Sequence, residues 1–191
     1  MNAQWLMILP RFRRNPDRST IAALYGAIVA QARNLTFYGA YGVPDTVLGR
    51  FDMVVLHAVL LVRRLRGSDA ARRLGQGVFD AFCRDMDDNL REMGVSDVGV
   101  PRTMRRLGEA FYGGARAYEA ALGAQGDEAL VATLTRNVYA EAVPVAAAPL
   151  ATYVRAAAGM LAGESDAALA RGEARFPDPD AFATPAMRAA E

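Results

Sequence analysis

The sequence contains no lysine, one cysteine and one histidine, and each scarcity excludes a class of site. All 22 basic residues are arginine, and against 21 acidic residues they leave a net charge of +1. So small an excess gives no general electrostatic attraction to nucleic acid, and we expect no DNA partner. A single cysteine, Cys83, cannot form an intramolecular disulfide, and a single histidine, His57, excludes zinc sites that need two histidines.

The sequence motifs of common enzyme classes are also absent. The chain has no glycine-rich phosphate loop, no Gly-x-Ser-x-Gly elbow and no paired-cysteine site. His57 lies in the most apolar part of the chain, a position more typical of a hydrogen-bonded core histidine than of a base or ligand. We therefore predict a protein that is not an enzyme and that needs no cofactor.

The first residues combine a short apolar run with basic residues. Trp5 to Leu9 is apolar, and Arg11, Arg13 and Arg14 follow it. The run is too short to cross a bilayer, but it could either pack on the rest of the protein or rest on an anionic membrane surface. We expect an N-terminal segment at residues 1–18, a helical domain at 19–176 and a mobile tail at 177–191.

Apolar residues recur at helical spacing along nearly the whole chain. Met53 to Val62 is apolar on every side except at His57, which is typical of a central, buried helix. The fold class we predict is all-α, in a single compact domain of about six to seven helices. The expected helices cover residues 19–35, 46–66, 69–93, 102–122, 127–142, 149–162 and 165–175.

The stretch "CRDMDDNLREMGVSD", residues 83–97, is rich in acids and raises the question of a metal site. Leu90 stands where a calcium loop needs glycine, and Ser96 stands where it needs glutamate. Apolar residues recur through this stretch at the spacing of one helix face. The stretch therefore predicts a helix with a core-facing stripe rather than a calcium loop. That stripe contains Phe79, Phe82, Cys83, Met86, Leu90 and Met93.

Three interpretations of the polar side of this helix remain open. Arg84–Asp88 and Asp87–Arg91 have the spacing of ion pairs on a solvated face. Alternatively, the edge formed by Asp85, Asn89 and Glu92 meets a protein partner. In the third interpretation, the acidic helix 85–92 binds a divalent metal in an all-helical enzyme, which requires acids from another helix beside it.

Three longer stretches resemble the ubiquinol–cytochrome c chaperone family. They are "YGVPDTVLGRFDMVVLHAVLLVRRL" (41–65), "GVFDAFCRDMDDNLREMGVSDVGVPRTM" (77–104) and "EAFYGGARAYEAAL" (109–122). The resemblance covers most of residues 20–140, about two thirds of the chain. In the third stretch the family commonly has Phe-Tyr-Gly-Arg, whereas Gly114 stands here in place of the arginine, and Arg116 is a candidate to replace it.

The resemblance implies a non-enzymatic, all-helical assembly factor. Its implied client is newly made cytochrome b of the respiratory complex ubiquinol–cytochrome c reductase (complex III), with the ribosome and a small partner protein as further candidate partners. Because no mitochondrial transit peptide is evident, we expect a bacterial member, located in the cytoplasm at the periphery of the inner membrane. The residues we assign to partner contact are Pro44, Asp45, Arg50, Asp52, Asp85, Asp88, Asn89, Arg91, Glu92, Tyr112 and Arg116.

Two clusters of arginines suggest a further surface. Arg63, Arg64 and Arg66, with Arg72 and Arg73, surround the end of one expected helix, and Arg102, Arg105 and Arg106 begin another. If the clusters meet in space, they form a basic patch for anionic lipid, ribosomal RNA or an acidic partner. A membrane-surface scaffold that uses these clusters and the N-terminal segment is therefore an alternative function.

Overall fold

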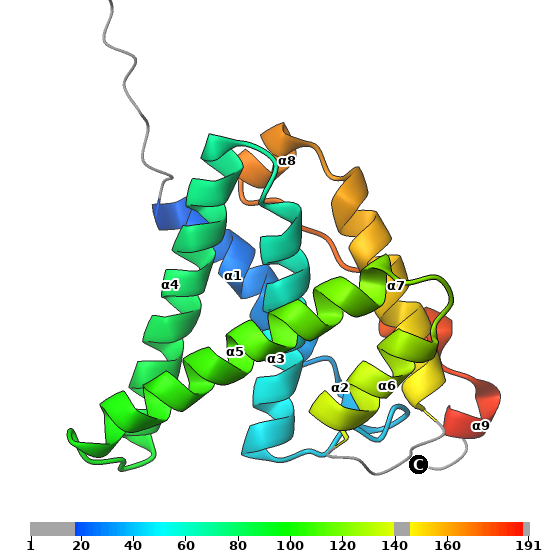
Figure 1. The fold of residues 1–191 in the computed structure, drawn as a ribbon, viewed down its shortest axis with the longest axis horizontal. Helices are drawn as coiled ribbons and strands as arrows, with labels where there is room; N and C mark the ends of the chain where they lie inside the picture. The colour runs from blue at the N-terminus through cyan, green and yellow to red at the C-terminus, as the bar shows by residue number, and fades with distance from the viewer. Residues whose placement is uncertain (1–17, 140–145, 189–191) are drawn as a thin grey trace, which may run out of the picture.

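The computed structural model describes residues 18–139 and 146–188, and within these ranges it contains helices and no strand. The helices come in the order shown in Figure 1. Their bounds are α1 Arg18–Ala32, α2 Leu35–Tyr38, α3 Val47–Arg64, α4 Asp69–Glu92, α5 Gly99–Gly123, α6 Glu128–Asn137, α7 Ala147–Gly163, α8 Asp166–Ala170, the 3-10 helix η1 Pro179–Phe182 and α9 Pro185–Arg188.

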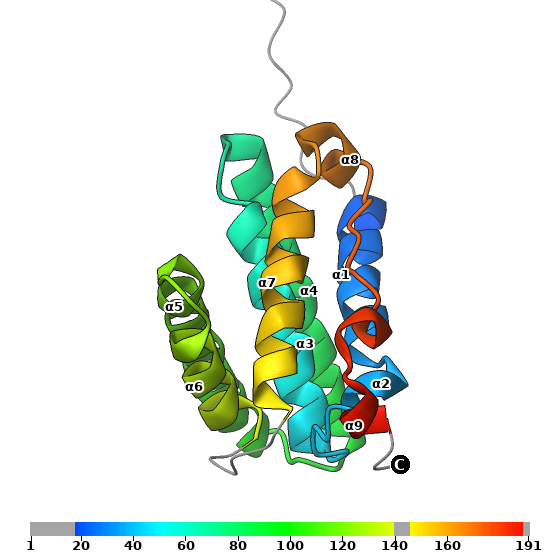
Figure 2. The same ribbon diagram turned by 90° about the vertical axis from the view of Figure 1, so that its right-hand side faces the viewer.

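Helix α3 is the centre of the arrangement, since α1, α4, α5 and α7 all pack against it. In Figure 2, α5 and α6 lie together on one side of α3 and α7, and α1 lies on the other side. The all-α fold in one compact domain is confirmed. No helix in the described part of the chain is both long and apolar enough to cross a membrane.

The only histidine lies at the middle of α3, completely buried. Its Nδ1 lies 2.7 Å from the carbonyl oxygen of Met53, and its Nε2 lies 2.7 Å from the Tyr153 hydroxyl on α7. A carbonyl only accepts, so Nδ1 carries the proton and Nε2 accepts from Tyr153. The Gln31 amide donates in turn to the Tyr153 oxygen at 3.0 Å. His57 is thus a satisfied core histidine that joins α3 to α7 and, through Gln31, to α1.

The chain beyond α8 differs from the mobile tail that we expected from residue 177. The Gln31 side chain on α1 donates to the carbonyl of Pro177 at 2.9 Å. The Tyr41 hydroxyl donates to the carbonyl of Pro179, the first residue of η1, at 2.9 Å. The rings of Phe176 and His57 lie 5.2 Å apart. This segment is held because its carbonyls satisfy buried donors and its aromatic side chains complete the core.

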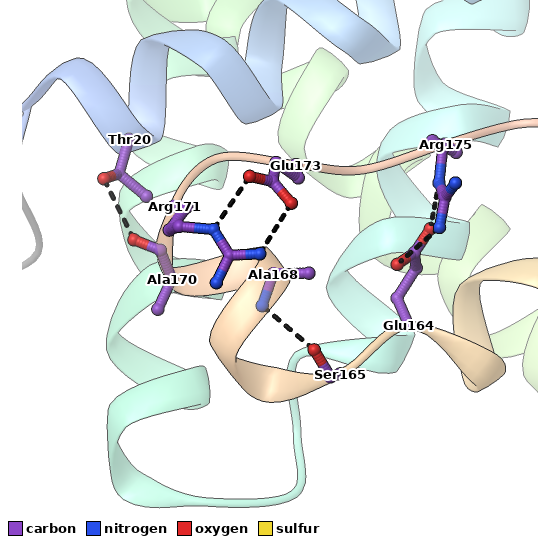
Figure 3. A network of polar contacts seen from close by, with 8 residues as sticks. All are labelled: Thr20, Glu164, Ser165, Ala168, Ala170, Arg171, Glu173 and Arg175. Atoms are coloured by element: carbon purple, nitrogen blue, oxygen red, sulfur yellow. Dashed lines mark hydrogen bonds and ion pairs between the residues drawn. The ribbon is translucent and has the colours of Figure 1, made fainter.

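The turn after α7 is fixed by a second set of polar contacts, drawn in Figure 3. The Ser165 hydroxyl accepts from the amide of Ala168 at 3.1 Å and so caps α8, which ends at Ala170 rather than near residue 175. Thr20 on α1 donates to the carbonyl of Ala170 at 3.2 Å. Glu164, only 7% exposed, pairs with Arg175 at 2.8 Å. These contacts direct the chain from α7 back across α1.

Local hydrogen bonds determine where α3 begins and where α4 ends. The Thr46 side chain accepts from the amide of Gly49 and begins α3. After α4, Gly94 takes a φ of 81°, and the amide of Val95 donates to the carbonyl of Leu90 at 3.0 Å. This is a Schellman ending, which needs a residue that tolerates the left-handed region. It gives α4 a defined end and turns the chain into α5.

The two arginine clusters do not meet. They lie at opposite ends of α4, whose 24 residues span about 36 Å. Arg63 and Arg66 pair with Glu119, and Arg64 pairs with Asp166 at 2.8 Å. The condition for one shared basic patch, that the two clusters meet in space, is therefore not met.

The buried histidine makes stability depend on pH. Burial lowers the pKa of His57 from 6.5 to about 4, although the Met53 carbonyl opposes this shift. The unfolded chain therefore binds a proton below about pH 6.5 that the folded chain does not accept until about pH 4, so stability falls with pH across this window. We predict that the free energy of unfolding drops more steeply from pH 7 to pH 4.5 in the wild type than in His57→Gln.

The measurement is urea unfolding followed by circular dichroism at both pH values. The acids common to both proteins cancel in the difference, which isolates the histidine. A difference between wild type and His57→Gln that stays constant from pH 7 to pH 4.5 would contradict the assignment.

Candidate functional site

An apolar groove of about 450 Å³ lies where the start of α3 faces the end of α4. Helix α1 contributes Val29 and Arg33 to it, and α5 contributes Leu107. We call this feature the apolar groove. It is lined by Val29, Arg33, Val47, Leu48, Arg50, Phe51, Val54, Asp85, Met86, Asn89, Leu90, Met93 and Leu107.

Several apolar side chains of the groove face solvent to an unusual degree. Val47 is 67% exposed, Leu48 is 66% exposed and Met93 is 61% exposed. Large apolar side chains gathered at one concave place, rather than scattered singly, mark an interaction surface. Met86 and Met93 add flexible, polarizable side chains that adapt to differently shaped partners. The groove therefore has the chemistry of a site for an apolar or amphipathic segment.

Part of the acidic edge predicted from the sequence lies in this groove. Asp85 and Asn89 line it, and Glu92 does not. The Tyr25 hydroxyl donates to Asp85 Oδ2 at 2.7 Å, and the Asn89 amide donates to the carbonyl of Asp85 at 2.6 Å. Burial and this carboxylate together raise the pKa of Tyr25. Asp85 thus ties α4 to α1 beside the groove.

The remaining charged residues of the acidic stretch lie on its solvated side. Arg91 pairs with Asp87 at 2.7 Å and with Asp97 at 2.5 Å, which fixes the loop after α4. Asp88 and Glu92 are exposed. The expected i,i+4 pair of Asp87 and Arg91 is present. The expected pair of Arg84 with Asp88 is absent from the ion pairs of residues 18–139 and 146–188.

The entry to α3 is a tight turn beside the groove. Arg50 lines the groove and pairs with exposed Asp45 at 2.6 Å, a contact that lowers the pKa of that carboxyl. The amide of Thr46 donates to the carbonyl of Pro44 at 2.8 Å. A Cβ at Gly49 would lie 2.0 Å from that carbonyl oxygen. The turn that presents Val47 and Leu48 therefore depends on a close backbone approach that only glycine allows.

The other residues assigned to partner contact lie outside the apolar groove. Tyr112 is 59% exposed, and its ring packs 5.5 Å from that of Phe79. Arg116 is exposed on α5. Asp52 lines a separate cavity between α3, α5 and α6, together with Gly114. The predicted residues thus divide among several surfaces instead of one.

The metal hypothesis required acids from another helix beside Asp85, Asn89 and Glu92. The charged groups that face Asp85 across the apolar groove are Arg33 and Arg50, which would repel a cation. Residues 18–139 and 146–188 contain no group of three or more histidine, cysteine or acidic side chains placed to hold a metal ion. The geometry that this hypothesis predicts is therefore not found.

The apolar part of the site was not predicted from the sequence. Val47 and Leu48 begin a helix whose central part is buried, so their exposure was not expected. The available signal was their place at the helix start, where fewer neighbours cover a side chain than at the centre. Val29 and Leu107 come from helices far apart in sequence, and only the fold brings them together.

Comparison with known proteins decides the family. The family model described as ubiquinol-cytochrome C chaperone matches residues 39–176. The chain belongs to the ubiquinol–cytochrome c chaperone family. A solved structure described as the Cbp3 homolog from Brucella abortus is 40% identical, with a TM-score of 0.80, over 86% of this chain and 92% of that one. No curated protein matches the chain. The family recognised from the sequence is thus confirmed, as is the role of assembly factor for ubiquinol–cytochrome c reductase.

The turn before α3 supplies a stability prediction. We expect Gly49→Ala to lower the free energy of unfolding by about 1–3 kcal/mol, because the new methyl group forces the Pro44 carbonyl out of place. The control is Gly26→Ala on α1, where nothing lies within 4 Å of the added Cβ. We expect that control to be neutral or slightly stabilising, because alanine favours a helix. Thermal and urea unfolding measure both, and equal effects would contradict the account.

Proposed function

We propose that this protein is a non-enzymatic chaperone that binds newly made cytochrome b and supports assembly of the ubiquinol–cytochrome c reductase complex. The observation that carries the proposal is the apolar groove with its exposed rim of Val47, Leu48 and Met93. A protein of this family that holds a membrane protein before insertion needs such a surface, because the client's apolar helices have no lipid around them.

The lining of the groove supports a helical client segment. Most of its lining residues come from two helices, the start of α3 and the end of α4, and α1 and α5 contribute the remaining side chains. Amphipathic helices bind such grooves through apolar side chains spaced by three and four residues. The polar groups at the edge, Asp85, Asn89 and Arg33, would contact the polar side of the same segment.

We infer that the protein acts in the cytoplasm at the periphery of the inner membrane, where its client is inserted. The N-terminal segment around Trp5 to Leu9, for which we leave open packing on the protein and contact with an anionic membrane, lies outside the described residues. A ribosome contact and a small partner protein are further proposals that follow from the family. The exposed residues Asp88, Arg91, Glu92, Tyr112 and Arg116 remain candidates for them.

The test replaces one apolar residue of the groove and compares it with a matched residue elsewhere. Leu48→Glu places a charge in the groove, whereas Leu35→Glu places one on α2, where Leu35 is 80% exposed and does not line the groove. We predict that unassembled cytochrome b co-purifies with the wild type and with Leu35→Glu from cells making the complex. We expect at least a tenfold loss with Leu48→Glu, because a charge must then be desolvated in the groove.

Both variants should unfold at the wild-type temperature, since both positions are exposed. If cytochrome b co-purifies with none of the three proteins, cytochrome b is not the client. If it co-purifies equally with all three, the client binds a different surface.

A further inference from the structure

A second cavity, of about 380 Å³, lies on the other side of the first turns of α3. Its walls come from α3, α5 and α6, and Phe51 is the one described residue that lines both this cavity and the apolar groove. The two sites therefore stand back to back across a single helix. Asp52 is the acidic residue of this second cavity.

Asp52 has no ionic partner within the part of the chain that the structure describes. The carboxyl is half-buried, and it makes no hydrogen bond or ion pair among residues 18–139 and 146–188. Burial raises its pKa to about 7, and no neighbouring cation opposes the shift. A carboxylate removed from water is unfavourable unless a cation or donors satisfy it. Residues 18–139 and 146–188 form no ion pair with this carboxyl, and it lines an open cavity.

The wall opposite Asp52 leaves room for a long side chain. Gly113 and Gly114 of α5 line the cavity, and a Cβ added at Gly114 would meet only Tyr118 and Val55, both at 3.9 Å. The rings of Phe51 and Tyr118 also line it. A guanidinium group suits this setting better than an ammonium group, because it is planar, less strongly hydrated and binds well against aromatic rings.

A second charge sets a further condition on the ligand. Arg136 of α6 lines the same cavity, is exposed and makes no ion pair within the described part of the chain. A ligand with positive charge alone would be repelled by it. The ligand that satisfies both groups carries a cation for Asp52 and an acidic group beside it for Arg136.

We propose that this cavity binds an arginine side chain of a protein partner, with its guanidinium on Asp52 and a neighbouring acidic side chain of the partner on Arg136. This contact is separate from the client binding proposed for the apolar groove. It would let the protein hold a second protein while the groove is occupied.

The first test uses the capped peptide acetyl-Ala-Arg-Glu-Ala-amide and carbon-detected NMR of the Asp52 carboxyl. We expect saturable binding that lowers the pKa of Asp52 from about 7. The same peptide with citrulline in place of arginine has the same shape without the charge, and we expect it to bind at least about tenfold more weakly. Asp52→Asn should lose the preference for arginine, and Arg136→Ala should weaken binding of the arginine peptide.

The second test supplies the cation from within the chain. Gly114→Arg should lower the pKa of Asp52 and block the peptide, whereas Gly114→Met, which adds an unbranched side chain without charge, should leave that pKa raised. Equal binding of the two peptides, binding of spermidine but not of the arginine peptide, or equal pKa values in the two Gly114 variants would each overturn the proposal. The peptide experiments do not involve cytochrome b, and the comparison of Leu48→Glu with Leu35→Glu does not involve Asp52, so failure of the two proposals can be told apart.

Discussion

The structure depends on the burial of the central part of α3 on all sides. A helix surrounded by α1, α4, α5 and α7 can hold a polar side chain only if its hydrogen bonds are complete, and His57 meets this condition through Met53 and Tyr153. The same network continues through Gln31 to the carbonyl of Pro177, so the last described segment is held by the core rather than by surface contacts. The position of α3 in turn decides which surfaces remain open.

Both candidate sites arise where this burial ends. The centre of α3 is covered by its neighbours, but its first turns extend past them, and Val47 and Leu48 remain exposed. On one side, the end of α4 lies opposite these turns and the apolar groove forms. On the other side, small residues of α5 leave a space beside Asp52. A rigid helix with an uncovered start thus presents two chemically different surfaces, one apolar and one charged.

The helices and the core could be predicted from the sequence because their signals are local. Periodicity located α3 and α4, Gly94 marked the end of α4, and the setting of His57 indicated a satisfied core histidine. The sites could be predicted only in part, since they depend on which helices meet. Asp85 and Asn89, which we assigned to partner contact, line the apolar groove, whereas Glu92 lies outside it and Asp52 lines a different cavity. The arginine clusters were separated by the length of α4, which a list of charges does not reveal.

The central claim, that the apolar groove holds the client, is tested most directly by site-specific photo-crosslinking in living cells. A photoreactive amino acid placed at Leu48 or Met93 reports what touches the groove, and one at Leu35, which is more exposed than either, reports contacts elsewhere. The account predicts crosslinks from positions 48 and 93 to newly made cytochrome b, and none from position 35. Crosslinks to cytochrome b from position 35 but not from positions 48 and 93 would contradict it.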